Sequence, residues 1–149
     1  MTPARLVLML IGFLFAGTVA ADPCLLTPDE LKQATGRAFE AGVPGKDIAT
    51  QEPQCTYAEK NKPKRSVMVR ILTEKAAQRY AANKRLVSFG NDPLDLEGVG
   101  EAAFYSGTTA GVLLGERAII LSTLRRAGDP KLERAAVVDL LRKAAERLK

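Results

Sequence analysis

The sequence predicts an α+β domain in which an antiparallel sheet of about five to six strands carries helices packed on one face. Short runs rich in β-branched residues recur between turn signals, and three other segments carry helix signals. The length of 149 residues, of which 46% are hydrophobic, is typical of one globular domain. These observations give the order α-β-β-β-α-β-β-β-α along the chain.

Residues 1–21 have the pattern of a signal peptide. Arg5 supplies a positive start, the apolar run Leu6–Ala16 follows, and small residues precede a cleavage site before Asp22. The run is short for a membrane span and lacks a basic flank after it, although an uncleaved N-terminal anchor is the alternative. We therefore expect residues 22–149 to form a single domain that is periplasmic or secreted.

A short helix is expected over Pro28–Thr35, because the flanking residues carry the signals for both of its ends. Thr27 suits the N-cap position, and Glu30 follows three residues later, which completes a capping box. Pro28 fits the first helical position, and Gly36 supplies the stop.

Three strands are expected next. A short strand over Arg37–Val43 precedes a Pro/Gly turn and an irregular stretch. The β-rich runs Gln54–Glu59 and Ser66–Thr73 then form a hairpin, whose tip is the charged segment 60–65. Alternation in the second run places Arg70 on the side opposite the valine and isoleucine side chains.

A second helix and a second group of strands follow. Thr73 suits the cap of a helix over residues 74–86, and a loop rich in glycine, proline and acidic residues comes after it. Gly115 and Glu116 suit a type II′ turn between two strands, since this turn favours glycine at its first central position. The three strands are expected at Ala102–Ser106, Gly111–Leu114 and Arg117–Thr123.

The last helix is expected to start at Asp129-Pro130, a capping residue followed by proline. Its apolar residues fall on one stripe, and its other face mixes acidic and basic residues. A helix that lies on a membrane would have a more purely basic face, so this one is expected to pack on the sheet. The stripe consists of Val137, Leu140, Leu141, Ala144 and Leu148.

Three roles are open to Cys24. Lipid attachment needs small residues directly before the cysteine, whereas Asp22 and Pro23 stand there. A nucleophilic thiolate usually needs a histidine as its base, and the chain contains no histidine. Two cysteines in an exported chain favour an intramolecular disulfide with Cys55, with free thiols or an intermolecular bond as the alternatives.

Catalytic patterns are scarce in this sequence. The absence of histidine excludes an ordinary catalytic triad, and the serines lie outside the known nucleophile motifs. Gly98–Ala103 matches the dinucleotide-binding fingerprint, but polar residues precede it and a β-like run follows, so a glycine turn entering a strand is expected. The chain is therefore predicted not to be an enzyme, and neither a metal nor a cofactor is predicted.

Two charged segments are candidates for interaction: a basic hairpin tip and an acidic loop. The tip suits anionic lipid, lipopolysaccharide or an acidic protein, although lysines at a loop tip often serve solubility alone. Loss of Arg5 lowers the formal net charge from +5 to +4, and acidic residues are spread among the basic ones, so nucleic acid is not an expected partner. The candidate residues are Lys60, Lys62, Lys64 and Arg65 on the tip, and Asp92, Asp95, Glu97 and Glu101 in the loop.

Three motifs together resemble a family of uncharacterised bacterial exported proteins and lipoproteins. They are "PCLLTPDELKQATG" from Pro23, "CTY" from Cys55 and "GVGEAAF" from Gly98, so the resemblance covers about residues 23–104. It implies an α+β fold with a Cys24–Cys55 bridge in an envelope or secreted protein, and it implies no activity. Several members are lipoproteins, and this chain departs from them because Cys24 is not placed for lipidation.

The leading hypothesis is a non-enzymatic periplasmic or secreted domain that binds a protein or an anionic envelope component. One alternative is an inhibitor of an exported hydrolase of the β-lactamase or peptidase type, which would present the loop Asp92–Glu101 to an active site. The other is a carboxylate-based enzyme, which needs two acids held together in a cleft.

Overall fold

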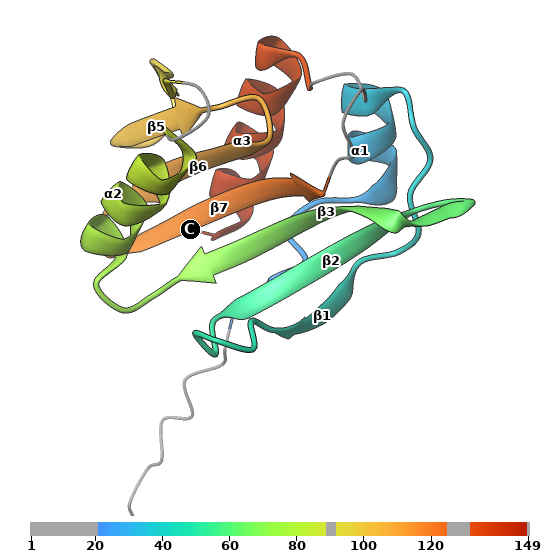
Figure 1. Ribbon diagram of the computed structural model, residues 1–149, viewed down its shortest axis with the longest axis horizontal. Helices are drawn as coiled ribbons and strands as arrows, with labels where there is room; N and C mark the ends of the chain where they lie inside the picture. The colour runs from blue at the N-terminus through green and yellow to red at the C-terminus, as the bar shows by residue number, and fades with distance from the viewer. Residues whose placement is uncertain (1–20, 89–91, 125–131, 149) are drawn as a thin grey trace, which may run out of the picture.

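The computed structural model describes residues 21–88, 92–124 and 132–148, and these residues contain one antiparallel sheet of seven strands (Figure 1). The helices are α1 (Pro28–Thr35), α2 (Ala76–Val87) and α3 (Arg134–Leu148). The strands are β1 (Val43–Lys46), β2 (Pro53–Glu59), β3 (Lys62–Leu72), β4 (Leu94–Asp95), β5 (Ala102–Tyr105), β6 (Thr109–Leu114) and β7 (Arg117–Leu124). The α+β class is confirmed, and the order matches the prediction except for β4, which the sequence did not indicate.

The sheet consists of two groups of consecutive strands that meet in its middle. Its spatial order is β1-β2-β3-β7-β6-β5-β4, so each group runs from an outer edge inward. The groups join where β3 pairs with β7, with Val69 opposite Leu121. Because β3 and β7 pair antiparallel, the C-terminal end of β3 and the start of β7 lie at the same end of the sheet.

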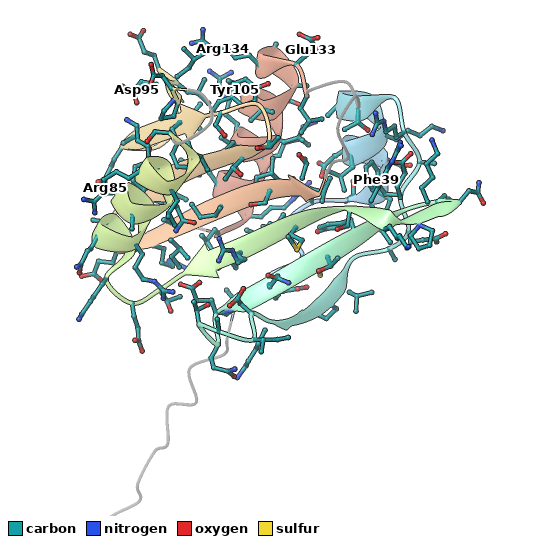
Figure 2. All side chains as sticks on the ribbon, viewed as in Figure 1. Phe39, Arg85, Asp95, Tyr105, Glu133 and Arg134 are labelled. Carbon is teal, nitrogen blue, oxygen red and sulfur yellow. A yellow bond between two sulfur atoms is a disulfide. The ribbon has the colours of Figure 1, made fainter. Side chains whose placement is uncertain are left out.

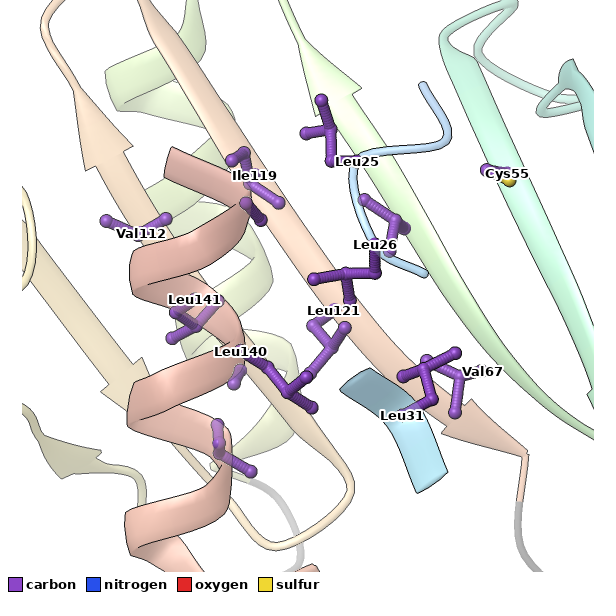
Figure 3. Close-up of a cluster of buried hydrophobic side chains, with 14 of the residues drawn as sticks. Leu25, Leu26, Leu31, Cys55, Val67, Val112, Ile119, Leu121, Leu140 and Leu141 are labelled. Atoms are coloured by element: carbon purple, nitrogen blue, oxygen red, sulfur yellow. The ribbon is translucent and has the colours of Figure 1, made fainter. Parts of the chain in front are cut away.

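α1 and α3 cover one face of the sheet (Figure 3). All five residues of the predicted stripe on α3 are at most 3% exposed. They belong to one buried cluster with Leu31 of α1 and with sheet residues such as Val67 and Leu121. The predicted packing of the last helix on the sheet is therefore confirmed.

α2 packs on the opposite face, so the prediction that the helices share one face is wrong. Its buried residues Ala76 and Tyr80 join a second cluster that contains Phe104 and Ile120. The rings of Tyr80 and Phe104 meet edge to face, with their centroids 5.3 Å apart. The sequence held a signal for this arrangement, because residues 119–121 of β7 are consecutive, apolar and buried, as in a strand covered on both faces.

The first helix begins and ends as predicted. The hydroxyl of Thr27 accepts a hydrogen bond from the Glu30 N–H at 3.2 Å, and the Glu30 carboxylate accepts one from the Thr27 N–H at 2.9 Å. Gly36 has a φ of 70°, in the left-handed region that ends helices. The capping box and the glycine stop are both confirmed.

The strand predicted over Arg37–Val43 is wrong. Within that segment, Phe39 pairs through an isolated bridge to Glu59, and Val43 at its end is the first residue of β1, opposite Thr56. β1 is instead formed by the predicted turn, which includes Pro44 and Gly45, and all four of its residues are exposed. β1 is the edge strand, where a proline is tolerated because its missing N–H need not face a partner strand.

Two other predicted boundaries can be compared with the structure. α2 begins at Ala76, and Lys75 before it has a left-handed φ of 50° with no side-chain cap, so the predicted Thr73 cap is wrong. The type II′ turn is supported, because Gly115 has a φ of 64° and Glu116 has no positive φ.

Some expectations concern residues that the structure does not describe. The signal peptide falls almost wholly on residues 1–20, and Asp129-Pro130 lies in the undescribed segment 125–131. The described helix α3 begins at Arg134, after two described residues that are not helical. No helix among the described residues is both long and apolar enough to cross a membrane.

The two helices on the same face are joined by an ion pair. Arg147 of α3 donates to both carboxylate oxygens of Glu30, at 2.7 and 2.6 Å, and also to the carbonyl of Leu25 at 2.7 Å. This hydrogen bonding to Arg147 is the main cause that lowers the pKa of Glu30 from 4.5 to about 2.

Because of the Glu30–Arg147 pair, part of the folded domain's stability is expected to be lost at acidic pH. Since the pKa of Glu30 is lower in the folded state, its stabilisation is complete above about pH 4.5 and is lost as the pH falls towards 2. We expect the unfolding free energy of the Glu30→Gln variant to fall less steeply than that of the unchanged protein between about pH 4.5 and pH 2. Urea denaturation at several pH values measures this slope. Asp29→Asn, on the same exposed turn, is the control, and an unchanged slope in Glu30→Gln would contradict the assignment.

Candidate functional site

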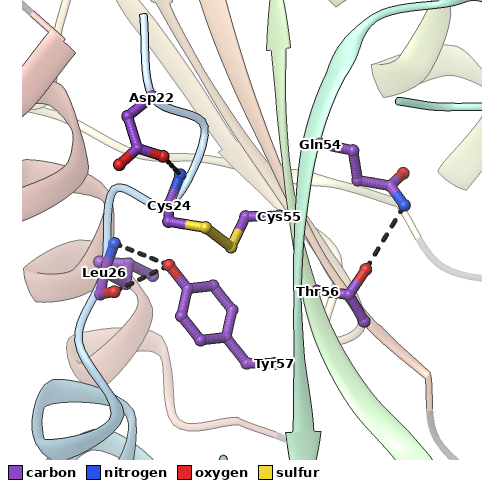
Figure 4. The surroundings of a disulfide bond; sticks show 7 residues. All are labelled: Asp22, Cys24, Leu26, Gln54, Cys55, Thr56 and Tyr57. Carbon is purple, nitrogen blue, oxygen red and sulfur yellow. Dashed lines mark hydrogen bonds between the residues drawn. A yellow bond between two sulfur atoms is a disulfide. The ribbon is translucent and has the colours of Figure 1, made fainter. Parts of the chain in front are cut away.

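Cys24 and Cys55 form the predicted intramolecular disulfide, with their Cα atoms 5.0 Å apart (Figure 4). Cys55 is fully buried on β2, so the bond fixes the segment before α1 against the sheet. Tyr57, two residues further on, donates its hydroxyl to the carbonyl of Leu26 at 2.7 Å and accepts from the Leu26 N–H at 3.1 Å. Both cysteines therefore have a structural role, and the bond fits the expected export.

The basic hairpin end, defined as Lys60, Lys62, Lys64 and Arg65, lies where β2 turns into β3. The tip is shorter than predicted, because Lys60 and Asn61 make the turn and β3 already begins at Lys62. Asn61 has a φ of 61°, which asparagine tolerates better than most residues.

A bulge in β3 shapes this end of the hairpin. Glu59 pairs with Lys62, but the preceding Ala58 pairs with Ser66, so residues 63–65 have no partners in the β2 ladder. An open hollow of about 350 Å³ lies at the bulge, and its described lining is Lys62, Pro63, Lys64 and Arg65. Three cationic side chains thus line an open hollow with the volume of a small-ligand site.

The net charge of the domain is concentrated at the basic hairpin end. Lys60, Lys62 and Lys64 are exposed, and none of them forms a salt bridge within the described residues. The nearest acid, Glu59, is 9% exposed at its side chain and is paired with Arg37 at 3.5 Å.

The charges at this end account for the whole excess. Together with Arg37 and Glu59, the basic hairpin end has five cations and one anion, a net charge of +4. Residues 22–149 also carry +4, since only Arg5 is removed from a total of +5, so the formal charges of the other residues sum to zero.

The acidic loop does not gather its carboxylates into a site. Asp92, Asp95, Glu97 and Glu101 are all exposed, and Asp95 pairs with Lys84 of α2 at 2.5 Å. Within the described ranges, no three histidine, cysteine, aspartate or glutamate residues are arranged to hold a metal ion.

The glycine motif that overlaps this loop is a turn. Gly98 and Gly100 have φ values of 71° and 58°, and the chain then enters β5 instead of a helix. The structure therefore confirms a glycine turn entering a strand and contradicts the dinucleotide-binding geometry, which requires a helix.

A cluster of acids and arginines, which sequence reasoning missed, lies between the β1–β2 loop and α2. Glu52 is only 5% exposed, and its carboxylate forms an ion pair with Arg79 of α2. Arg70 of β3 lies 3.9 Å from Glu52 and 3.8 Å from Asp47. The Thr50 hydroxyl contacts both carboxylates, at 3.0 Å to Asp47 and 2.9 Å to Glu52.

This cluster is better suited to holding a loop than to acid–base chemistry. Hydrogen bonds from Thr50, first of all from its backbone N–H, lower the pKa of Asp47 and keep it ionised. Arg79 compensates Glu52, as a buried charge requires, and Arg70 lies near the more exposed Asp47. A single clue was present in the sequence: Arg70 stands on the strand face opposite the valine and isoleucine residues, where it needs a partner.

Comparison with protein-family models, with curated proteins and with solved structures gives no match to this chain. The resemblance based on the cysteine and glycine motifs therefore stays a prediction.

Proposed function

We propose that the protein is a non-enzymatic exported domain that binds an anionic partner at the basic hairpin end. The partner is an anionic component of the cell envelope or an acidic surface on another protein. The observation that carries this proposal is the location of the charge, because one hairpin end holds the entire net charge of residues 22–149. Charge spread for solubility would not leave the rest of the domain neutral.

The geometry of the hairpin also supports this proposal. β2 and β3 extend beyond the helices at this end, which leaves the tip accessible (Figure 1). The backbone that holds it is firm, since β3 pairs with both β2 and β7 from Ser66 onward. Lys62, Lys64 and Arg65 thus lie on the extension of a central strand of the sheet, and Lys60 lies in the turn before it, a shorter support than a long loop.

Replacing Lys60, Lys62 and Lys64 with glutamine is expected to weaken binding to an anionic probe by at least tenfold at low salt. Two probes represent the two kinds of partner: fluorescent polyglutamate, and vesicles that contain phosphatidylglycerol. Titration with each probe at low and high salt gives the affinity and its salt dependence. We expect binding of the unchanged protein to at least one probe, and a shallower salt dependence in the triple variant.

A matched control removes the same charge elsewhere. Lys46, Arg85 and Arg117 are exposed, and Lys46 and Arg117 lie at the opposite end of the strands. Arg85 is also far from the hairpin end. Figure 2 shows it on α2, at the other end of the sheet from Phe39, which pairs with Glu59 next to the tip. Glutamine at these three positions should weaken binding less than threefold. Equal weakening in both triple variants, or no binding to either probe, would contradict the proposal.

An inhibitor of an exported hydrolase is the second candidate, and one observation favours it. Leu96 and Val99 are at most 5% exposed and anchor the acidic loop in the core, so that Glu97 between them is displayed on a firm support. Adding the protein to assays of β-lactamases and peptidases tests this candidate. Unchanged activity at micromolar protein would remove it.

A further inference from the structure

We infer that the partner of the basic hairpin end is a bilayer surface that carries anionic phosphate headgroups. This inference rests on the proposed function and narrows it to one partner. Lys60, Lys62 and Lys64 end in compact ammonium groups on flexible stems, which suit a surface of many phosphates without fixed geometry. A shaped carboxylate site on a protein is more often matched by the planar fork of arginine.

The basic hairpin end lacks the apolar core that a protein partner requires. Protein interfaces concentrate their affinity in buried aromatic or aliphatic side chains with a charged rim. In the described part of the chain, the large exposed hydrophobic side chains are Val43, Ile48, Leu86 and Leu94, and none belongs to residues 59–65. A headgroup surface needs no such core, since lysines near anionic lipid are attracted by charge alone.

The bulge gives this end room for a headgroup. Pro63, Lys64 and Arg65 leave the β2 ladder, and the hollow of about 350 Å³ opens beside them. This volume lies at the lower end of the range for small-ligand sites, which fits a phosphate-bearing headgroup better than a folded protein segment. The cations in its described lining make an anionic occupant the favourable one.

The acidic loop does not oppose this approach to a bilayer. β4, which holds Asp95, is four strands away from β3 in the sheet. At a strand spacing near 4.8 Å this separation is about 19 Å, twice the distance over which exposed charges act at physiological salt. The hairpin end, which extends beyond the helices, therefore meets the surface as a separate positive patch (Figure 1).

Three probes, two read by vesicle sedimentation and one by fluorescence titration, distinguish this inference from the proposed function. The vesicles are of phosphatidylcholine alone or of phosphatidylcholine with phosphatidylglycerol, and the titrated probe is fluorescent polyglutamate. We expect binding that requires phosphatidylglycerol, and a loss of about 100-fold when Lys60, Lys62 and Lys64 become glutamine, because each lysine contributes roughly a factor of five. The Lys46, Arg85 and Arg117 triple variant should stay within threefold of the unchanged protein.

Each outcome decides between the two claims. Binding to polyglutamate without binding to phosphatidylglycerol vesicles would overturn this inference and leave the proposed function standing. Failure with both anionic probes would overturn both. The apolar run Leu6–Ala16, where it is retained, would insert equally with and without phosphatidylglycerol, so only the difference between the two vesicle types counts.

Discussion

Replacing both Cys24 and Cys55 with alanine is expected to lower the free energy of unfolding by about 3–4 kcal/mol. The bond closes a loop across a sequence separation of 31, and its loss frees the unfolded chain to adopt many more conformations. It also releases the segment before α1, whose remaining ties to β2 include the two hydrogen bonds between Tyr57 and Leu26. Urea denaturation, monitored by circular dichroism, measures the change.

Reduction of the unchanged protein provides the control for this double variant. Its unfolding free energy with the disulfide reduced should fall close to that of the double variant, since both lack the same bond. A loss smaller than about 1 kcal/mol in both samples would contradict the structural role given to the bond. Because the basic hairpin end lies at the far end of β2 from Cys55, anionic binding by the folded double variant should be unchanged.

Replacing Gly100 with alanine is expected to cost about 3–4 kcal/mol of stability. Its φ of 58° is strained for a residue with a Cβ, and that Cβ would lie 2.5 Å from a methyl group of Val112 and 2.6 Å from the Leu113 carbonyl. The carbonyl belongs to the backbone of β6, so it cannot move away without disturbing the sheet. Urea denaturation again provides the measurement.

Gly98 supplies a matched control for the clash at Gly100. Its φ of 71° is equally left-handed, but the nearest atom to an added Cβ is Arg142 Nη2 at 3.6 Å, an ordinary contact. Gly98→Ala should therefore cost only about 1–2 kcal/mol, the price of the backbone conformation alone. Equal losses in the two variants would show that the close approach of Gly100 to β6 does not matter.

Local patterns predicted the parts of the fold that depend on neighbours in sequence. The capping box at Thr27 and the turn at Gly115 involve residues within a few positions of each other, and both are supported. The disulfide could be predicted for a different reason, since two cysteines allow only one intramolecular pairing. The buried stripe of α3 followed from helical spacing alone.

The features that sequence reasoning missed depend on contacts between distant segments. The side on which α2 packs is decided by Phe104 and Ile120, which follow it in the chain by many residues. β1 forms from proline and glycine because β2 is available beside it, although local propensity favours a turn there. Likewise, Glu52 meets Arg79 only after β3 and α2 have folded against the loop.

The basic hairpin end was visible in the sequence only as a run of charge. What the structure adds is its position at a projecting bulge and the pairing of Glu59 with Arg37. These features are the ones on which the proposed binding surface rests, whereas composition alone gives the same net charge for a solvated loop.

Mapping of backbone amide shifts during titration with phosphatidylglycerol-containing bicelles tests the location of binding most directly. The predicted result is that the largest shifts fall on residues 59–65 and on Arg37, the partner of Glu59. The amide chemical shifts of residues near Arg85 and Arg117, at the other end of the molecule, should not change. Largest shifts in the acidic loop or around Glu52, with residues 59–65 unmoved, would contradict the account.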